Sequence, residues 1–445
     1  MIIVETVPGT TLERVIAAVD ERADEIVEFA AELIRQPSVN PDLEPNELAE
    51  RPAQDWLRDQ LHLFGAFDAV DSWEVAESRP NVVAVRKGSG VGRSLTWSAH
   101  TDVVPVTPEQ AEQWSGAGPF SGEVRDGKLW GRGASDMKGA IAAYAMATRI
   151  LHDTGVRLKG DLILSQACGE ESGRRDIGCN TVLERGYRSD LAIFPEISNF
   201  RIYPAAKGEL YFRLTVPGKS THICNRNQVV QALPHGVERP GVSAIDNMLK
   251  YQLALLELER QWLLWRTNPN VEPGGMFINI NTLQAGTSIT SIPDSCEATG
   301  SLLFYPDLTA DEVMAEIRTT IDRVTAADYW LRDHPPLLDL PLDAASAAPW
   351  VKEPVNMPFD HPGVQVISDV MKSVSGRDAV VETAPFVCDA NFWFPLGQPS
   401  LIFGIGDPSW GTHGTDEFLP VEDLIEATKI FAGVTMAWCG VTDSE

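Results

Sequence analysis

The stretch Leu95-Thr96-Trp97-Ser98-Ala99-His100-Thr101-Asp102 predicts a short strand that ends in metal-type ligands. In an extended segment, residues i and i+2 share a face, so His100 and Asp102 point the same way. This spacing suits an imidazole ligand that is oriented by a carboxylate behind it. A lone His-x-Asp at a strand end is, however, more often structural.

Strand and helix candidates alternate on both sides of this strand. Helical spacing of apolar residues and short apolar runs mark helices at Glu21–Arg35, Met137–His152 and Val421–Trp438, and strands at Asn81–Val85, Leu162–Ala167, Leu191–Phe194 and Ser400–Gly404. This alternation predicts an α/β fold with a mostly parallel sheet and helices on both faces.

A different pattern interrupts this α/β domain. It runs through a strand, a long helix, two strands and a helix, at Glu209–Val216, Val242–Trp265, Phe277–Leu283, Cys296–Tyr305 and Thr309–Val324. That order predicts an inserted α+β domain of the open-faced sandwich type. We therefore expect a catalytic domain at 1–206 and 351–445, and an inserted domain at 207–350.

Two further motifs place carboxylates beside expected strand ends, where the active sites of open α/β sheets gather. In Gly131–Gly139 the glycines permit tight turns, so that Asp136 can face the sheet edge, although Asp136 could also simply cap the next helix. Glu170 and Glu171 follow the strand Leu162–Ala167, and such neighbours are costly unless cations neutralise them. One of the pair could bind a metal while the other acts as a general base, although an exposed acidic turn is the alternative.

Glu196 follows the strand Leu191–Phe194, and His413 lies in Gly411–Glu417, between the last strand and the last helix. Each has a structural explanation when it is taken alone. Together the motifs supply two imidazoles and three carboxylates as metal ligands. Two further carboxylates remain, one to orient a ligand and one to act as a general base. That set suits a bridged pair of zinc-type ions ~3.5–4 Å apart.

In their order and context these motifs resemble the dinuclear zinc amidohydrolases and metallopeptidases. That family includes acetylornithine deacetylase, succinyl-diaminopimelate desuccinylase, aminoacylase and carboxypeptidase G. The resemblance runs from about Ile26 to Ala437. It implies a residue for each role: His100 and Glu196 on one metal, Glu171 and His413 on the other, Asp136 as the bridge, Glu170 as the general base, and Asp102 orienting His100.

The inserted domain resembles the family's lid and dimerisation domain. Its segment Val216-Pro217-Gly218-Lys219-Ser220-Thr221-His222 is similar to a strand and loop whose His reaches a partner subunit's active site and stabilises the oxyanion. The resemblance implies that His222 is catalytic and that the chain forms a homodimer through this domain. A solvent-facing loop histidine is the alternative.

Three positions depart from the family pattern, and one of them is Thr290, where the usual residue is Asn. Many relatives carry arginines for the substrate's carboxylate where this chain has Ser301 and Asn391. Carboxylate recognition should therefore matter less here, or rest on Lys207 or Arg226.

Composition narrows the partners and the compartment. With 36 basic and 63 acidic residues, the net charge of −27 repels phosphate backbones and anionic membranes, so we expect neither nucleic acid nor membrane as a partner. The N-terminus shows no secretory signal, and the six cysteines are scattered without a C-x-x-C pair. These features favour a cytoplasmic protein.

The combined interpretation is a hydrolase that cleaves an amide-type C–N bond of a small molecule, as an N-acyl amino acid deacylase or a dipeptidase-like enzyme does. Two divalent ions are expected, with zinc favoured and cobalt or manganese as substitutes. Hydrolytic deamination of an aromatic or unusual small molecule is a second possibility, motivated by the missing arginines and by four aromatic residues: Phe304, Tyr305, Phe392 and Trp393. The pattern also permits an exopeptidase that accepts long substrates, or a non-catalytic binding protein that retains the fold.

Overall fold

The chain divides into two compact units, of which the second is inserted into the first. A computed structural model describes residues 9–225, 241–342 and 351–442. The first unit comprises Met1–Ala205 and Val355–Glu445, and the second comprises Ala206–Pro354. Among the described residues, no helix combines the length and the apolar character that crossing a membrane requires.

A large sheet forms the centre of the first unit. Its strands are β1 (Ala69–Ala76), β2 (Arg79–Arg86), β3 (Leu95–His100), β6 (Leu162–Ala167), β7 (Leu191–Phe194), β8 (Ile202–Ala206), β14 (Val355–Asn356), β15 (Val381–Ala384) and β16 (Ser400–Ile402). They lie in the order β1-β2-β6-β3-β7-β16-β8-β14, with β15 paired to β8. The central strands β6, β3, β7 and β16 are parallel, whereas β1, β2 and β8 run antiparallel to their neighbours. The carboxyl ends of the central strands therefore meet at one edge.

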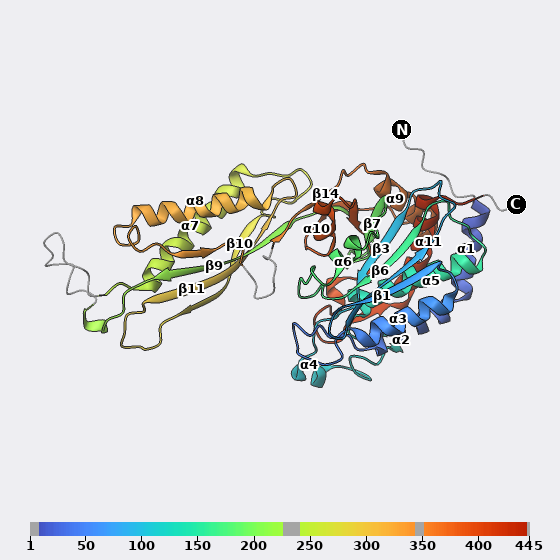
Figure 1. The fold of residues 1–445 in the computed structure, drawn as a ribbon, viewed down its shortest axis with the longest axis horizontal. Coiled ribbons are helices and arrows are strands. Elements are labelled where there is room, and N and C mark those ends of the chain that lie inside the picture. Colours follow the sequence, from blue (N-terminus) through green and yellow to red (C-terminus); the bar gives the residue numbers. More distant parts are fainter. Residues whose placement is uncertain (1–8, 226–240, 343–350, 443–445) are drawn as a thin grey trace. The chain divides into compact units, whose positions relative to one another are not determined.

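Helices surround the sheet of the first unit (Figure 1). They are α1 (Gly9–Glu21), α2 (Ala23–Arg35), α3 (Arg51–Phe64), α4 (Pro108–Gln113), α5 (Gly139–Asp153), α6 (Cys179–Glu184), α9 (Pro362–Ser375), α10 (Ala390–Trp393) and α11 (Val421–Cys439), with short helical turns η1 (Ala134–Lys138), η3 (Phe394–Leu396) and η4 (Pro408–Trp410). A small sheet of β4 (Glu123–Arg125), β5 (Lys128–Trp130) and β17 (Phe418–Pro420) completes the unit.

Apolar contacts show that both faces of the large sheet are covered. On one face, the Trp97 ring of β3 lies 4.4 Å from the Phe431 ring of α11, measured between centroids. Ile193 of β7 pairs with Trp97 and so shares its face, which turns the next residue, Phe194, to the other side. There the Phe194 ring meets that of Trp393 in α10, with centroids 5.2 Å apart. The α/β fold predicted from the sequence is confirmed.

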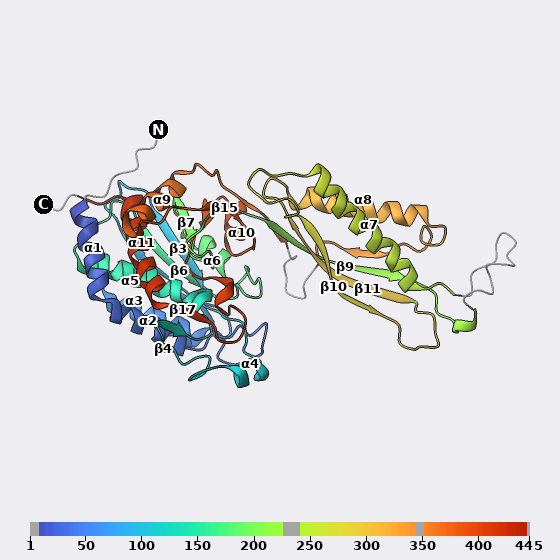
Figure 2. The same cartoon turned by 180° about the vertical axis from the view of Figure 1, so that it is seen from behind.

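The second unit is an open-faced sandwich. Its strands are β9 (Gly208–Pro217), β10 (Phe277–Ala285), β11 (Ser295–Phe304), β12 (Leu337–Asp339) and β13 (Val351–Lys352), and its helices are η2 (Ile223–Asn225), α7 (Ala244–Trp265) and α8 (Ala310–Ala327). The strands lie in the order β10-β11-β9-β12, with β13 also paired to β9. Alternate β9 residues, among them Phe212 and Leu214, are buried in a core that also contains Tyr251 of α7 and Ile317 of α8. Figure 2 shows both helices on the same side of this sheet.

Candidate metal centre

His100 ends β3 at the carboxyl edge of the parallel strands, where it is 2% exposed. Its Nδ1 lies 2.9 Å from the backbone oxygen of Asp102 and 3.6 Å from the Asp102 carboxylate. This contact directs Nε2 of the ring to the opposite side. The Asp102 carboxylate accepts hydrogen bonds from the backbone N–H groups of Glu170 and Glu171, at 3.2 and 3.0 Å, and from the side chain of Asn40 at 2.7 Å. Asp102 thus ties His100 to the loop that carries both glutamates.

Asp136 reaches the same edge because the backbone before α5 is not helical. Its φ and ψ are −127° and 92°, and α5 begins at Gly139 rather than at Met137 as the sequence pattern suggested. Gly133 supplies the turn with a φ of +87°, in the left-handed region that favours glycine. Asp136 therefore projects from a loop instead of capping the helix.

Glu417 holds this loop in place, a role that the sequence analysis did not assign. Its carboxylate accepts hydrogen bonds from Arg132 Nη1 at 2.7 Å and from the backbone N–H groups of Gly133, Ser135 and Asp136 at 2.9–3.0 Å. Glu417 is only 1% exposed. The sequence does show Glu417 as an acidic residue at the end of the His413 motif. Because the set of metal ligands was complete without it, the motif gave no reason to assign it a role.

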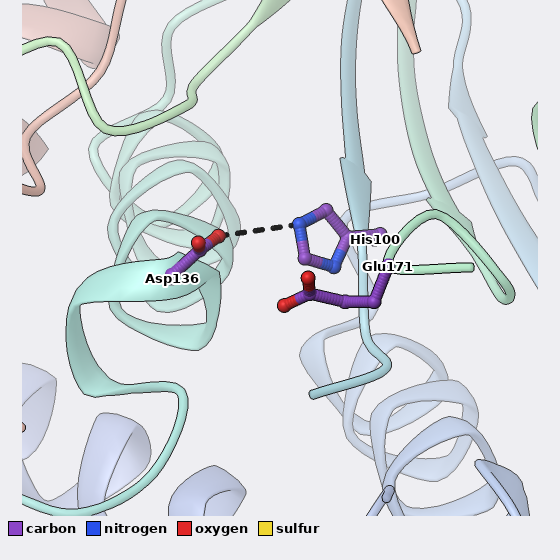
Figure 3. A group of neighbouring side chains, drawn as sticks. All are labelled: His100, Asp136 and Glu171. Carbon is purple, nitrogen blue, oxygen red and sulfur yellow. Dashed lines mark ion pairs between the residues drawn. The ribbon is translucent and has the colours of Figure 1, made fainter. Parts of the chain in front are cut away.

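Asp136 lies between the two imidazoles that the sequence analysis singled out. Its Oδ1 is 3.3 Å from His100 Nε2, and its Oδ2 is 3.2 Å from His413 Nε2. His413 Nε2 also lies 3.2 Å from Glu171 Oε2. Ligand atoms of His100, Asp136 and Glu171 all lie within 4.8 Å of one another (Figure 3). One carboxylate oxygen of Asp136 thus faces each imidazole.

Two carboxylate oxygens of this cluster lack a hydrogen-bond donor within the described part of the chain. Asp136 Oδ1 and Glu171 Oε1 are buried and accept no hydrogen bond from any described residue. Burial, together with the nearby Asp136 charge, raises the pKa of Glu171 to about 7. Burial likewise raises the pKa of Glu196 well above its ordinary value. Buried carboxylates with unsatisfied oxygens beside imidazole nitrogens are a donor set that fits zinc-type divalent cations.

Glu196 follows β7 and is 5% exposed. The charges of His100, Asp136, Glu170 and Asp389 all act on its carboxyl group, so Glu196 lies in the neighbourhood of these residues. Asp389, at the start of α10, is a buried carboxyl to which the sequence analysis assigned no role. Burial, and next the charge of Glu170, raise its pKa to about 7. The first unit thus brings four of the predicted ligands into contact, His100, Asp136, Glu171 and His413, with Glu196 in their neighbourhood and the Glu170 backbone held by Asp102.

His222 belongs to the inserted unit. It is exposed, forms an isolated β-bridge with Ser291, and accepts a hydrogen bond from the backbone N–H of Cys224 at 3.3 Å through Nδ1. Ser301 of β11 accepts a hydrogen bond from Asn281 at 3.3 Å. Arg226 lies outside the described residues.

Asn391 and the four aromatic residues have structural surroundings. Asn391 is buried, and its side-chain oxygen accepts a hydrogen bond from the backbone N–H of Cys388 at 3.0 Å. The aromatic residues that motivated the deamination alternative are all buried, at 5% exposure or less: Phe304, Tyr305, Phe392 and Trp393. They are accounted for by packing.

Comparison with known proteins places this arrangement in a family. Residues 96–437 match the family described as peptidase family M20/M25/M40. The chain belongs to this family. The resemblance found in the sequence is therefore confirmed, and this M20 member is a hydrolase that acts on C–N bonds. The non-catalytic alternative receives no support from this match.

Relatives cover nearly the whole M20 chain. The N-formyl-4-amino-5-aminomethyl-2-methylpyrimidine deformylase of Bacillus subtilis is 30% identical over 429 residues, which are 95% of this chain and 96% of the relative. A succinyl-diaminopimelate desuccinylase of Methylorubrum extorquens is 30% identical over 426 residues, 92% of this chain and 98% of the relative. Human carnosine dipeptidase 1 shares the fold, with a TM-score of 0.69 at 16% identity over 97% of this chain and 100% of its own.

Proposed function

We propose that this M20 hydrolase removes a small acyl group, formyl in the first instance, from an amine nitrogen carried on a heteroaromatic ring. The main support for hydrolysis is the position of Asp136, whose carboxylate turns one oxygen towards His100 and the other towards His413. The substrate class is supported by two deformylases that are both 30% identical to this chain. The one from Bacillus subtilis covers 95% of this chain, and the one from Halalkalibacterium halodurans covers 97%.

Two divalent ions complete the proposed site. His100 and Glu196 would hold one ion, Glu171 and His413 the other, and Asp136 both. When bound, such ions polarise a carbonyl oxygen and lower the pKa of water. Zinc is favoured because imidazole and carboxylate ligands suit it, with cobalt and manganese as substitutes.

Glu170 is the proposed general base. It precedes the ligand Glu171, and its backbone N–H is held by Asp102 at 3.2 Å. Its carboxylate takes a proton from the attacking water as the new C–O bond forms at the acyl carbon. It then passes that proton to the nitrogen as the C–N bond breaks, so that the products are a carboxylic acid and a free amine.

Carboxylate recognition separates the proposed substrate from the other candidates. Ser301 and Asn391 stand where many relatives carry arginine, and neither can pair with a carboxylate as a guanidinium does. The formamide that the deformylases are named for carries no carboxylate, which agrees with this departure. Removal of a succinyl group is the second candidate, because the desuccinylase of Methylorubrum extorquens is also 30% identical, over 92% of this chain.

The inserted unit offers a surface for a second copy of the chain. β10 is an edge strand of its sheet and contacts α7. The large apolar side chains that α7 exposes are Ile245, Leu249, Leu253, Leu256, Leu263, Leu264 and Trp265. The first four recur at helical spacing, and an apolar stripe beside an open strand edge is typical of an interface. We propose a homodimer through this surface, in which His222 acts on the partner's substrate as the oxyanion donor.

The six cysteines bear on the compartment. All of them lie among the described residues, where they form no disulfide, and Cys224 is exposed. Free thiols persist in reducing compartments, so we propose the cytoplasm.

A substrate panel tests the proposed function. Metal-loaded protein would be given an N-formyl aminomethylpyrimidine, an N-succinyl diamino acid, a dipeptide and a substituted aniline, with detection of formate, amine and ammonia. We expect equal amounts of formate and amine from the formyl compound, at a kcat/KM at least about tenfold above the others. Preference for the succinyl compound would favour the second candidate, and release of ammonia from the aniline would overturn the deacylase assignment.

A further inference from the structure

A buried ion pair lies at the start of β2, outside the residues that the proposed mechanism uses. Arg79 is 3% exposed and Glu50 is fully buried. Nε and Nη2 of Arg79 donate to the Glu50 carboxylate at 2.6–3.1 Å, in a two-nitrogen contact. Burying two charges costs free energy that their attraction offsets only with good geometry, so such a pair is weak evidence for stability. A role in positioning other groups is the alternative.

The remaining nitrogen of Arg79 begins a chain of hydrogen bonds. Nη1 donates to Asp42 Oδ2 at 2.6 Å, and the same oxygen accepts from the Ser172 hydroxyl at 3.0 Å. Ser172 directly follows Glu171, so Arg79 reaches the loop of the two glutamates through a single intervening carboxylate.

A second branch reaches the same loop from Asn40. Its side-chain nitrogen donates to Ser172 Oγ at 3.0 Å and to Asp102 Oδ2 at 2.7 Å. Asp102 in turn holds the backbone N–H groups of Glu170 and Glu171. The loop is therefore fixed at its backbone by Asp102 and at its next side chain by Asp42.

Arg79 also packs directly against this loop. Gly169, the residue before Glu170, has a φ of +82°, and a Cβ added there would lie 3.2 Å from Arg79 Nη2. Two residues along β2, Asn81 accepts a hydrogen bond from the Cys168 N–H at 2.9 Å and donates to the Ile177 oxygen at 2.8 Å. The start of β2 thus holds the first and the last part of the loop.

We propose that Arg79 is a positioning residue, which fixes the Glu170–Glu171 loop through Asp42 and Ser172. This inference rests on the proposed role of Glu170 as the general base. Adjacent carboxylates repel each other, so a loop that presents them needs contacts that hold its backbone. Small displacements of a catalytic group reduce the rate strongly, whereas binding of substrate depends less on them.

Substitutions that keep the fold test the proposal. Ser172→Ala and Asp42→Asn alter half-buried or exposed side chains. Arg79→Lys can keep a hydrogen bond to Glu50 but loses the hydrogen bond to Asp42, because an ammonium group lacks the fork of a guanidinium. Each should lower kcat about 10- to 100-fold at saturating metal, with KM as in the wild type. The Asp42→Asn/Ser172→Ala double variant should lose no more than the worse single variant, because both interrupt one chain of contacts.

Arg86→Lys is the matched control. Arg86 lies at the other end of β2, is 8% exposed, and donates to the backbone oxygens of Thr148 and Val156. The Arg86→Lys substitution should lower the melting temperature of the protein and leave kcat unchanged. Wild-type kcat in both Ser172→Ala and Asp42→Asn, or an effect confined to KM or metal content, would overturn the positioning role. Turnover by Glu170→Gln would instead overturn the proposed function, so the two failures are distinguishable.

Discussion

His413 Nε2 lies 3.2 Å from Asp136 Oδ2, although the two residues are far apart in the chain. His413 is contributed by the loop before β17, and Asp136 by the loop before α5, which Glu417 fastens. The contacts with His100 and His413 outweigh burial and hold the pKa of Asp136 below its ordinary value. A shared carboxylate that stays ionised between two imidazoles is what a pair of bridged cations requires.

The two neighbouring glutamates should have opposite phenotypes. Glu170→Ala should keep both metals and lose turnover by about 10²–10⁴-fold, the range for loss of a general base. Glu171→Ala should lose metal, because Glu171 Oε2 lies 3.2 Å from His413 Nε2 and its other oxygen is unsatisfied. Elemental analysis and steady-state kinetics of both variants check this. Exchanged phenotypes would reverse the assignment within the pair.

Glu417 should matter for both stability and metal binding. Glu417→Gln leaves the buried Arg132 without its charged partner, which typically costs about 3–5 kcal/mol. It also weakens the anchoring of the Asp136 loop, so metal affinity should fall. Denaturant unfolding and metal titration measure the two effects. Asp416→Asn is the control: its more accessible side chain accepts the Ser115 N–H, and a cost below about 1 kcal/mol is expected. Equal effects of both substitutions would contradict the anchoring role.

The metal-centre candidates were accessible to sequence reasoning because each one follows a strand or a glycine turn. Parallel strands bring their carboxyl ends together whatever the loops between them do. The supporting residues were not accessible in this way. Asn40, Glu50 and Arg79 act through hydrogen bonds to residues distant in the chain, which no local pattern encodes. The edge strand β1 was also missed, since its half-exposed residues lack the apolar run that marked β3.

His222 should act across the proposed dimer. An inactive His222→Ala protein mixed with an inactive Glu170→Ala protein should regain activity after subunit exchange, because half of the mixed sites hold both groups. Kinetics before and after exchange measure the recovery. Leu249→Glu places a charge on the exposed face of α7. Light scattering should then show a monomer, and kinetics should show that this monomer has low activity. A fully active monomer, or exchange without recovery, counts against the role in trans.

A substrate carboxylate should contribute little to recognition. An arginine at the position of Ser301 or Asn391 would offer a charge-assisted contact worth ~1.5–3 kcal/mol, which neither residue supplies. The comparison is between an N-acyl amino acid and its carboxamide or methyl ester. Amidation should cost less than about tenfold in kcat/KM, or ~1.4 kcal/mol. A thousandfold loss would reveal a strong carboxylate site elsewhere, with Lys207 the first residue to substitute.

The central claim is hydrolysis at two cations that share Asp136, and a metal titration tests it most directly. Chelated protein would receive zinc, cobalt or manganese in steps, while release of amine and metal content per chain are measured together. Activity should be absent without metal and should reach its plateau as the second ion binds. Full activity with no more than one tightly bound ion per chain would contradict the account.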